Sequence, residues 1–283
     1  MKTPFPSRLP SLARALPLSG RIGLFLVCFW LVVALAGPLI APYSVGGFVD
    51  YDVFGPMSAR FWLGSDYLGR DVLSRLLWGA RYTVFLGLGA ALVASATGTA
   101  LALFAAVRRG WVDEAISRTM DTLISIPSKV FALVMVAAFG SSLGLLLLIA
   151  AITYVPGNFR IARAIALDLA AMDYVTFARA QGESPVHIAL REILPNMIHP
   201  LLADLGLRFV FIVLLLSGLS FLGLGVQPPH ADLGSLVREN ISGITEGAPA
   251  IIAPAIAIAT LTVGANLLID ALKSSRGGKG KPA

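Results

Sequence analysis

Long segments without a charged residue constrain this chain more than any other feature of its sequence. They lie at residues 22–40, 82–107, 130–159, 209–226 and 247–269. A helix crosses the hydrocarbon core of a bilayer with about 20 residues, whereas a strand of a membrane barrel needs about ten alternating ones. Since only helices and closed barrels satisfy their backbone polar groups in lipid, the sequence predicts an all-α, polytopic membrane protein.

The segment at 130–159 is too long for one helix. Gly140, Ser141 and Ser142 interrupt it with residues that favour a turn, so we divide it into a span at about 118–139 and another at about 143–163. Together with the other four segments, this predicts about six transmembrane helices. Residues 22–81 then contain the first helix and a long outer loop, and residues 82–272 contain the other helices.

The composition agrees with residence in a membrane. Apolar residues make up 57% of the 283 residues and charged residues 13%, against about 45–50% and about 25% in soluble domains. The segment at 22–40 is longer than the apolar core of a signal peptide and no clear cleavage site follows it, so we expect a retained first span. Cys28 is the only cysteine, which excludes an intrachain disulfide.

Lysine and arginine are distributed unequally between the two sides of the predicted helices. Fifteen of the 22 lie in the tails or in connections on the same side as the tails, five lie on the opposite side, and Lys129 and Arg208 lie within spans. The positive-inside rule therefore places both tails, residues 1–21 and 273–283, in the cytoplasm. It also explains the net charge of +6 without a nucleic-acid partner.

The predicted outer loop at about 41–81 ends in a segment with apolar residues at helical spacing. We expect residues 71–81 to form a short amphipathic helix on the membrane surface before the second span. Asp71 and Arg75 would pair across one helical turn. The last outer loop, at about 227–246, is a second surface that an outside partner can reach.

The longest inner loop, at about 165–201, is compatible with helix but too charged to cross the bilayer. We predict a helix over 164–181 that ends at Gly182, because glycine suits the left-handed position after a helix. Ser184 would cap a second helix with Pro185 at its first position. That helix would end near Pro195, which cannot continue it comfortably.

This helix–bend–helix has two interpretations. The bend and Ala178 are small, which would let a partner approach closely and makes the loop a candidate docking site. Alternatively, any large loop of this kind needs capped helices for its own stability.

Two basic residues within predicted spans need an explanation. A basic side chain at the bilayer centre costs about 2.5–3.5 kcal/mol on insertion scales, so Lys129 and Arg208 should meet a partner, water or a translocation path. Asp121 and Asp204 are candidate partners, and Asp204 lies one helical turn before Arg208. We favour a pair between Asp204 and Arg208, and a Lys129 that extends toward the membrane surface.

Several other functions lack support in the sequence. No phosphate-binding loop of the G-x-x-x-x-G-K-[ST] type occurs, the three histidines are dispersed, and no metal-ligand constellation is visible. An intramembrane serine protease would need a histidine base beside Ser141 or Ser142. An ion-coupled secondary transporter, the main alternative, would predict inverted repeats and buried carboxylates near the midplane, and we find neither.

Short motifs along the chain carry a family resemblance. Residues 173–182 (DYVTFARAQG) and 191–196 (REILPN) resemble the "EAA" loop of ABC-importer permeases, with Thr176 and Phe177 where that loop usually has Glu-Ala. Residues 61–66 (FWLGSD), 68–75 (LGRDVLSR) and 219–229 (LSFLGLGVQPP) are similar to the dipeptide/oligopeptide/nickel permeases. Residues 79–81, 125–128 and 266–268 match as well.

The resemblance implies a type I ABC-importer permease in a bacterial inner membrane, which moves peptides or a related solute and has no catalytic residue or cofactor of its own. Its partners would be a second homologous permease, two ATP-binding subunits that hold ATP and Mg, and an extracytoplasmic solute-binding protein, besides membrane lipid. The inner loop would be the coupling loop to the ATP-binding subunits. Its site residues would be Tyr174, Ala178, Gly182, Ser184, Arg191 and Pro195.

Overall fold

The computed structural model describes residues 16–48 and 52–277, and only the backbone of 275–277. The elements in this part are helices: α2 (Leu18–Ile40), α3 (Val72–Arg108), α4 (Gly110–Ile124), α5 (Ser128–Phe139), α6 (Leu143–Ala170), α7 (Asp173–Ala180), α8 (Pro185–His187), the π-helical turn η1 (Ile188–Ile193), α9 (Leu194–Phe221), α10 (Leu233–Glu239), the 3-10 turn η2 (Ile241–Glu246) and α11 (Pro249–Gly277). The predicted all-α class is confirmed.

Five continuous helical stretches are long and apolar enough to cross a membrane: Leu18–Ile40, Val72–Arg108, Leu143–Ala170, Pro185–Phe221 and Pro249–Ser274. The sixth candidate is the pair α4 and α5, which bends by 84° at the break between them. The sequence predicted a single helix here. Pro127 explains the break, because it lacks the N–H of a continuing helix and disfavours helical backbone at Ile126.

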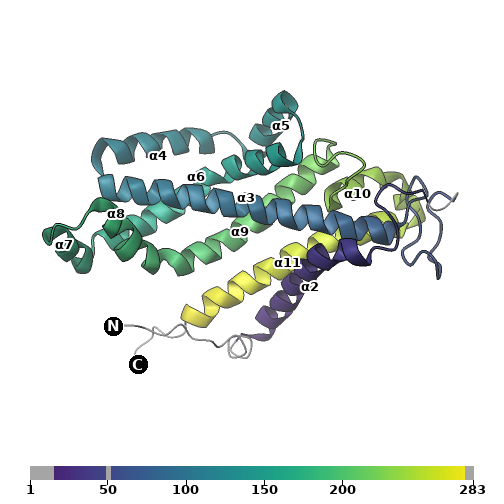
Figure 1. Cartoon of the computed structure of the whole chain (residues 1–283), viewed down its shortest axis with the longest axis horizontal. Coiled ribbons are helices and arrows are strands. Elements are labelled where there is room, and N and C mark those ends of the chain that lie inside the picture. Colours follow the sequence, from purple (N-terminus) through teal and green to yellow (C-terminus); the bar gives the residue numbers. More distant parts are fainter. Residues whose placement is uncertain (1–15, 49–51, 278–283) are drawn as a thin grey trace.

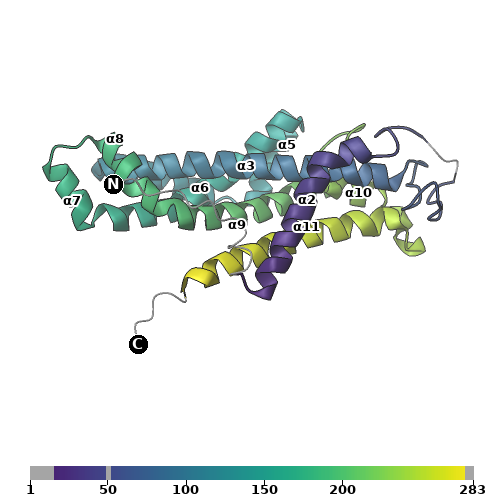
Figure 2. The ribbon, with the colours of Figure 1, turned by 60° about the horizontal axis from the view of Figure 1, so that its bottom comes forward.

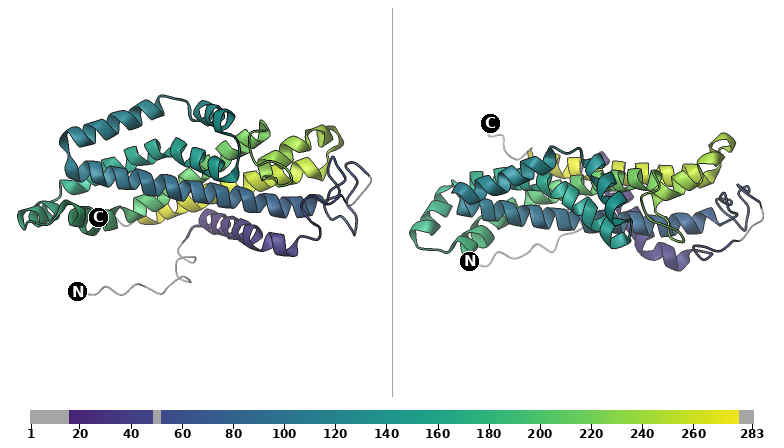
Figure 3. Two further views of the ribbon diagram at one scale, coloured as in Figure 1. Left: turned by 45° about the horizontal axis from the view of Figure 1, so that its top comes forward. Right: turned by 90° about the horizontal axis from the view of Figure 1, so that it is seen from above.

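The long helices α3, α6 and α9 run along the long axis of the molecule (Figure 1). Helix α2 packs on α11 and α3 and crosses α11 at an angle (Figure 2). The bent pair α4 and α5 lies on the side of α3 opposite α2 (Figure 3). Helices α7 and α8 mark one end of the molecule, and α10 with residues 52–71 marks the other (Figure 1).

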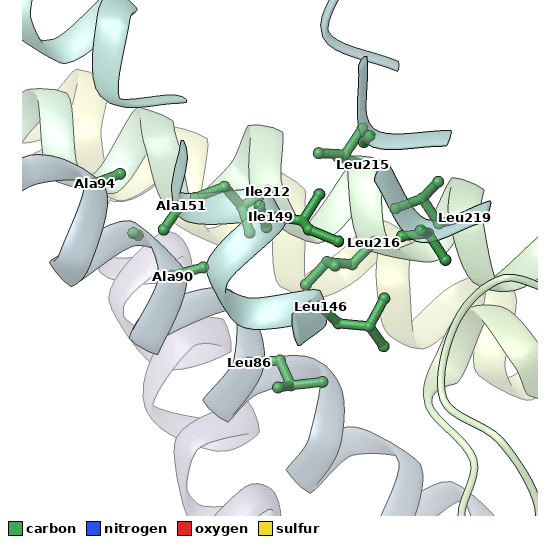
Figure 4. Close-up of a cluster of buried hydrophobic side chains, with 14 of the residues drawn as sticks. Leu86, Ala90, Ala94, Leu146, Ile149, Ala151, Ile212, Leu215, Leu216 and Leu219 are labelled. Atoms are coloured by element: carbon green, nitrogen blue, oxygen red, sulfur yellow. The ribbon is translucent and has the colours of Figure 1, made fainter. Parts of the chain in front are cut away.

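The central core lies where α3, α6 and α9 meet (Figure 4). Helix α3 contributes mainly alanines, such as Ala90 and Ala94. Helix α6 contributes alanines and larger residues, such as Ala151 and Leu146, and α9 contributes larger residues such as Ile212. Small residues allow helix backbones to approach closely in a membrane, where association depends on packing rather than on expulsion of water. The alternation of small and large side chains therefore fixes how these three helices fit together.

Glycines also allow α2 and α11 to approach closely. A Cβ atom on Gly23 would lie 2.6 Å from the Leu268 nitrogen and 2.7 Å from the Gly264 oxygen. Both contacts are with backbone, which cannot rotate away. The first span is thus attached to the last one at a position that accepts glycine alone without a backbone shift.

The expected surface helix at 71–81 does not exist as a separate element. Helix α3 begins at Val72 and continues without a break to Arg108. Asp71 caps it by accepting a hydrogen bond from the Ser74 N–H at 2.7 Å. Arg75 is 2% exposed and pairs with other acids, so the predicted Asp71–Arg75 pair is wrong. Burial on all sides, rather than the amphipathic pattern, decides the course of this segment.

The inner loop also differs from the prediction in two places. The expected helix over 164–181 is broken at residues 171–172, between α6 and α7. The helix after Gly182 does not stop at Pro195 but widens into η1 and continues as α9. Because the Leu194 N–H bonds to Ala189, five residues back, the wider turn accommodates the missing N–H of Pro195.

Candidate functional site

The first candidate site is the elbow, which we define as residues 171–193. Helix α7 ends in a left-handed Gly182 with a φ of 83°. The Gly182 N–H donates to the Arg179 carbonyl at 3.0 Å and the Glu183 N–H to the Ala178 carbonyl at 3.2 Å. These two hydrogen bonds are the pattern of a helix that ends at a glycine. Ser184 Oγ accepts from the His187 N–H at 3.2 Å, with Pro185 at the first helical position. The predicted stop and cap are confirmed.

The inward face of the elbow packs on the ends of the long helices. Val175, Ala178, Ile188 and Ile193 are buried against alanines of α3 and α6. Ala178 therefore makes room for helix packing and does not face a partner, contrary to the expectation from its size. Packed interiors are stiff, so the elbow is joined firmly to α3 and α6.

The outward face of the elbow carries large exposed apolar side chains among its polar and charged ones. Phe177, Val186 and Leu190 are 65%, 67% and 52% exposed, and Met172 and Tyr174 lie beside them in the chain with 49% and 38% exposure. We call these five residues the elbow patch. Exposed apolar surface of this kind marks an interface with another molecule.

The other predicted loop residues lie around this patch. Gly182, Ser184, Arg191 and Pro195 are exposed, and the Tyr174 hydroxyl accepts a hydrogen bond from Asn196 at 3.4 Å. Sequence reasoning did not select Phe177, Val186 or Leu190 as surface residues. The available signal was apolar side chains in a segment too charged to enter the bilayer.

A cleft of about 400 Å³ lies further along the molecule. Helices α4, α5, α6 and α9 and the break in the bent pair line it, through Leu123, Ile124, Ile126, Ser128, Phe131, Ile152, Thr153, Tyr154, Pro156, Gly157, Arg160, Arg208 and Phe211. Tyr154 and Phe211 stack with their ring centroids 6.4 Å apart. The cleft therefore combines aromatic walls with two guanidinium groups.

The predicted pair between Asp204 and Arg208 is present at this cleft. Arg208 Nε lies 3.1 Å from Asp204 Oδ2, and Nη2 lies 3.0 Å from Oδ1. Asn158 Nδ2 donates to Asp204 Oδ2 at 2.7 Å, and Thr99 Oγ1 donates to Asn158 Oδ1 at 3.3 Å. Three helices, α3, α6 and α9, thus hold one arginine in place.

Lys129 lies elsewhere. It is exposed at the start of α5 and, among the described residues, has no hydrogen-bond or ion-pair partner. Its candidate partner Asp121 instead accepts a hydrogen bond from Arg160 at 2.7 Å. Because Lys129 does not line the cleft, the structure separates it from Arg208.

The end of the molecule opposite the elbow is fastened by a buried ionic cluster, which we call the clamp. Asp66 Oδ2 accepts from Arg70 Nε at 2.8 Å and from Arg75 Nη1 at 2.7 Å. Glu239 Oε2 accepts from Arg70 Nη2 at 2.9 Å and from Arg75 Nη1 at 2.8 Å. The clamp connects the segment before α3 and the first turn of α3 to α10, a contact between distant parts of the chain that no sequence pattern predicted.

A second buried acid lies near the clamp. Asp232 is 4% exposed, accepts a hydrogen bond from the Ser235 N–H at 2.7 Å, and so caps α10. The Ser220 hydroxyl at the end of α9 also donates to it. Burial raises the pKa of Asp232 above its ordinary value of 3.8, against the opposing effect of these hydrogen bonds.

Known proteins show similar sequences over almost the whole chain. The family described as "Binding-protein-dependent transport system inner membrane component" matches residues 98–276. The glutathione transport system permease protein of Pectobacterium atrosepticum is 34% identical over 89% of this chain and 84% of its own length. A putative peptide transport system permease protein of Brucella suis biovar 1 is 35% identical over 90% and 86%. The matched regions contain both the elbow and the cleft.

Proposed function

The chain belongs to the binding-protein-dependent transport system inner membrane components, and from this premise we propose that it imports a peptide or a glutathione-like solute, driven through its elbow. As a member of that family it is a non-catalytic, multi-pass permease subunit of an ABC transporter. This membership replaces the alternatives of an ion-coupled transporter and an intramembrane protease. We further propose which solute it carries, how its partner subunits are arranged and how the chain is oriented in the membrane.

One observation carries the coupling role of the elbow. Residues Pro185–Phe221 form one continuous helical stretch, so the helix that begins just after the Gly182 bend is the same helix that carries Arg208 and Phe211 on the cleft. About 18 residues separate Leu190 from Arg208, or about 27 Å of helix. A displacement of Val186 and Leu190, the two residues of the elbow patch on this stretch, is therefore transmitted along the helix to the wall of the cleft.

The proposed mechanism follows from this connection. Two ATP-binding subunits, which hold ATP and Mg, grip the elbow of this chain and of a second permease subunit. When the ATP-binding subunits close on each other, the helices that follow the elbows tilt. The packed helices then switch between two arrangements instead of deforming gradually. A solute delivered by an extracytoplasmic binding protein at the clamp end then gains access to the other side. Both chain termini and the elbow are cytoplasmic in this arrangement.

Gly182→Trp tests the proposal. A side chain at Gly182 would meet open space within the chain, as would one at Gly140, and both glycines have positive φ, 83° and 97°. Gly140→Trp is therefore a matched control for backbone strain and added bulk far from the elbow. We expect Gly182→Trp to lose the co-purifying ATP-binding subunits and ATP-dependent uptake, while Gly140→Trp keeps the subunits bound. Equal co-purification and uptake in both variants would contradict the coupling role.

A further inference from the structure

The charged side chains that line the cleft are all positive. Its charged members are Arg160 and Arg208, and among the described residues no carboxylate lines it. The acids that balance them face elsewhere: Asp204 lies behind Arg208 and is 5% exposed, and Asp121 contacts Arg160 from outside the cleft. A solute in the cleft thus meets guanidinium groups first.

Arg208 has one unused donor group. Its Nε and Nη2 bind Asp204, whereas Nη1 makes no hydrogen bond within the described part of the chain. Nη1 lies against the Gly157 backbone, where a Cβ atom would come within 2.5 Å of it. Gly157 itself lines the cleft, so the glycine creates the space in which this nitrogen reaches the cleft.

The support behind Arg208 is more elaborate than charge neutralisation requires. Asn158 is fully buried and fixes Asp204, and Thr99 in turn fixes Asn158. Buried ion pairs in membranes are costly and are often replaceable by apolar residues without loss of stability. A guanidinium held in one orientation by residues of three helices has the preorganisation that a binding site needs.

We propose that the cleft is a carboxylate subsite for the solute, in which Arg208 and Arg160 bind the carboxylate while the Tyr154–Phe211 stack contacts the neighbouring apolar part. This inference rests on the proposed transport function and specifies its substrate class: small solutes with a free carboxylate, such as the C-terminus of a short peptide. The unused Nη1 of Arg208 can donate a charge-assisted hydrogen bond to a carboxylate oxygen. The cleft volume lies in the range of small-molecule sites, about 300–1,000 Å³.

Gly157→Ala tests the subsite without removing any charge. The new methyl group would displace the Arg208 guanidinium, not backbone, and alanine favours a helix interior. Gly144→Ala, in the same helix α6 with open space around it, is the matched control. The double variant Asp204→Asn/Arg208→Gln removes the guanidinium without leaving a buried unpaired acid.

The measurement is ATP-dependent uptake by the assembled transporter, with its solute-binding protein, in proteoliposomes. The probes are radiolabelled trialanine, its C-terminal amide and reduced glutathione. We expect Gly157→Ala and the double variant to lower uptake of trialanine and glutathione about tenfold or more, the size of a lost charge-assisted contact. Uptake of the amide should change little, so that the acid-to-amide ratio falls toward one. Gly144→Ala should keep the wild-type ratio.

The outcomes of this experiment test the carboxylate subsite and the transport function separately. ATP-dependent uptake with an acid-to-amide ratio unchanged by the cleft variants overturns the subsite and leaves the transport function standing. ATP-driven import of other solutes, without uptake of trialanine or glutathione, also overturns the subsite. A wild-type chain that binds no ATP-binding subunits and supports no ATP-dependent uptake contradicts the proposed function itself.

Discussion

Arg75 and Glu239 form a buried ion pair with 2.8 Å between Nη1 and Oε2, although 164 residues separate them in the chain. The same Arg75 nitrogen also binds Asp66, while Nε and Nη2 have no partner among the described residues. One nitrogen therefore joins the start of α3 to α10. The clamp fixes the end of the molecule at which, in the proposed orientation, the binding protein delivers solute.

Glu239→Gln should weaken this connection. It removes one of the two charges that hold a buried arginine, and we expect the free energy of unfolding to fall by about 1–3 kcal/mol. Glu114→Gln is the control, because Glu114 pairs with Arg118 on the surface at 3.5 Å and such pairs contribute about 0–1 kcal/mol. Denaturant unfolding of both variants in detergent micelles measures the difference, and equal losses would argue against a stabilising clamp.

Asp232 predicts a pH dependence of stability. Because burial raises its pKa in the folded chain above the ordinary 3.8, the folded state binds this proton more tightly than the unfolded state. The resulting stabilisation is complete below pH 3.8 and is lost as the pH rises through the raised pKa. Asp232→Asn cannot ionise and retains an oxygen that caps α10, so it escapes this loss.

The check is a pair of melting curves for wild type and Asp232→Asn at about pH 4 and about pH 8. The melting temperature of the variant relative to wild type should rise between the lower and the higher pH. Other titrating groups are common to both chains and cancel in this comparison. A difference that is constant with pH would show that Asp232 keeps its ordinary pKa, and a change in the opposite direction would show that folding lowers its pKa.

Phe177 should anchor the ATP-binding subunits. It is 65% exposed, against 38% for Tyr174, so Phe177→Ala removes little from the folding core but deletes the more exposed of the two aromatic side chains in the elbow patch. Aromatic residues at interface centres often contribute about 2 kcal/mol or more, and we expect affinity for the ATP-binding subunits to fall at least about tenfold. Thr176→Ala, at the exposed neighbouring position, should change it little. Pull-down of the ATP-binding subunits from membranes measures this affinity. If both variants retain these subunits equally, the elbow patch is not their binding surface.

Gly23→Ala should separate the first helix from the last. The added Cβ would lie less than 3 Å from the backbone of α11, so α2 must move outward and the tight glycine contact is lost. We expect a lower melting temperature and cleavage of α2 by added protease under milder conditions. Gly218→Ala in α9 meets nothing within 4 Å and should behave like wild type. Unchanged melting of Gly23→Ala would show that the α2–α11 contact contributes no stability.

The amino-acid sequence by itself determined the features that depend on neighbours in the chain. Hydropathy over about 20 residues identified the spans, since the bilayer thickness sets their length. The stop at Gly182 and the cap by Ser184 follow from local backbone geometry. The Asp204–Arg208 pair follows from the spacing of one helical turn, because both residues lie in the same helix.

Only the tertiary structure decided the features that depend on distant segments. Arg75 looked like a partner of Asp71, yet packing of α3 against α10 buries it beside Glu239. Ala178 was expected to let a partner approach closely, yet it is buried in a cluster with alanines of α3 and α6. Arg208 reaches the cleft because Gly157 of another helix leaves room for it. Local patterns state which residues can pair or be buried, and the packing of helices against one another selects which of them do.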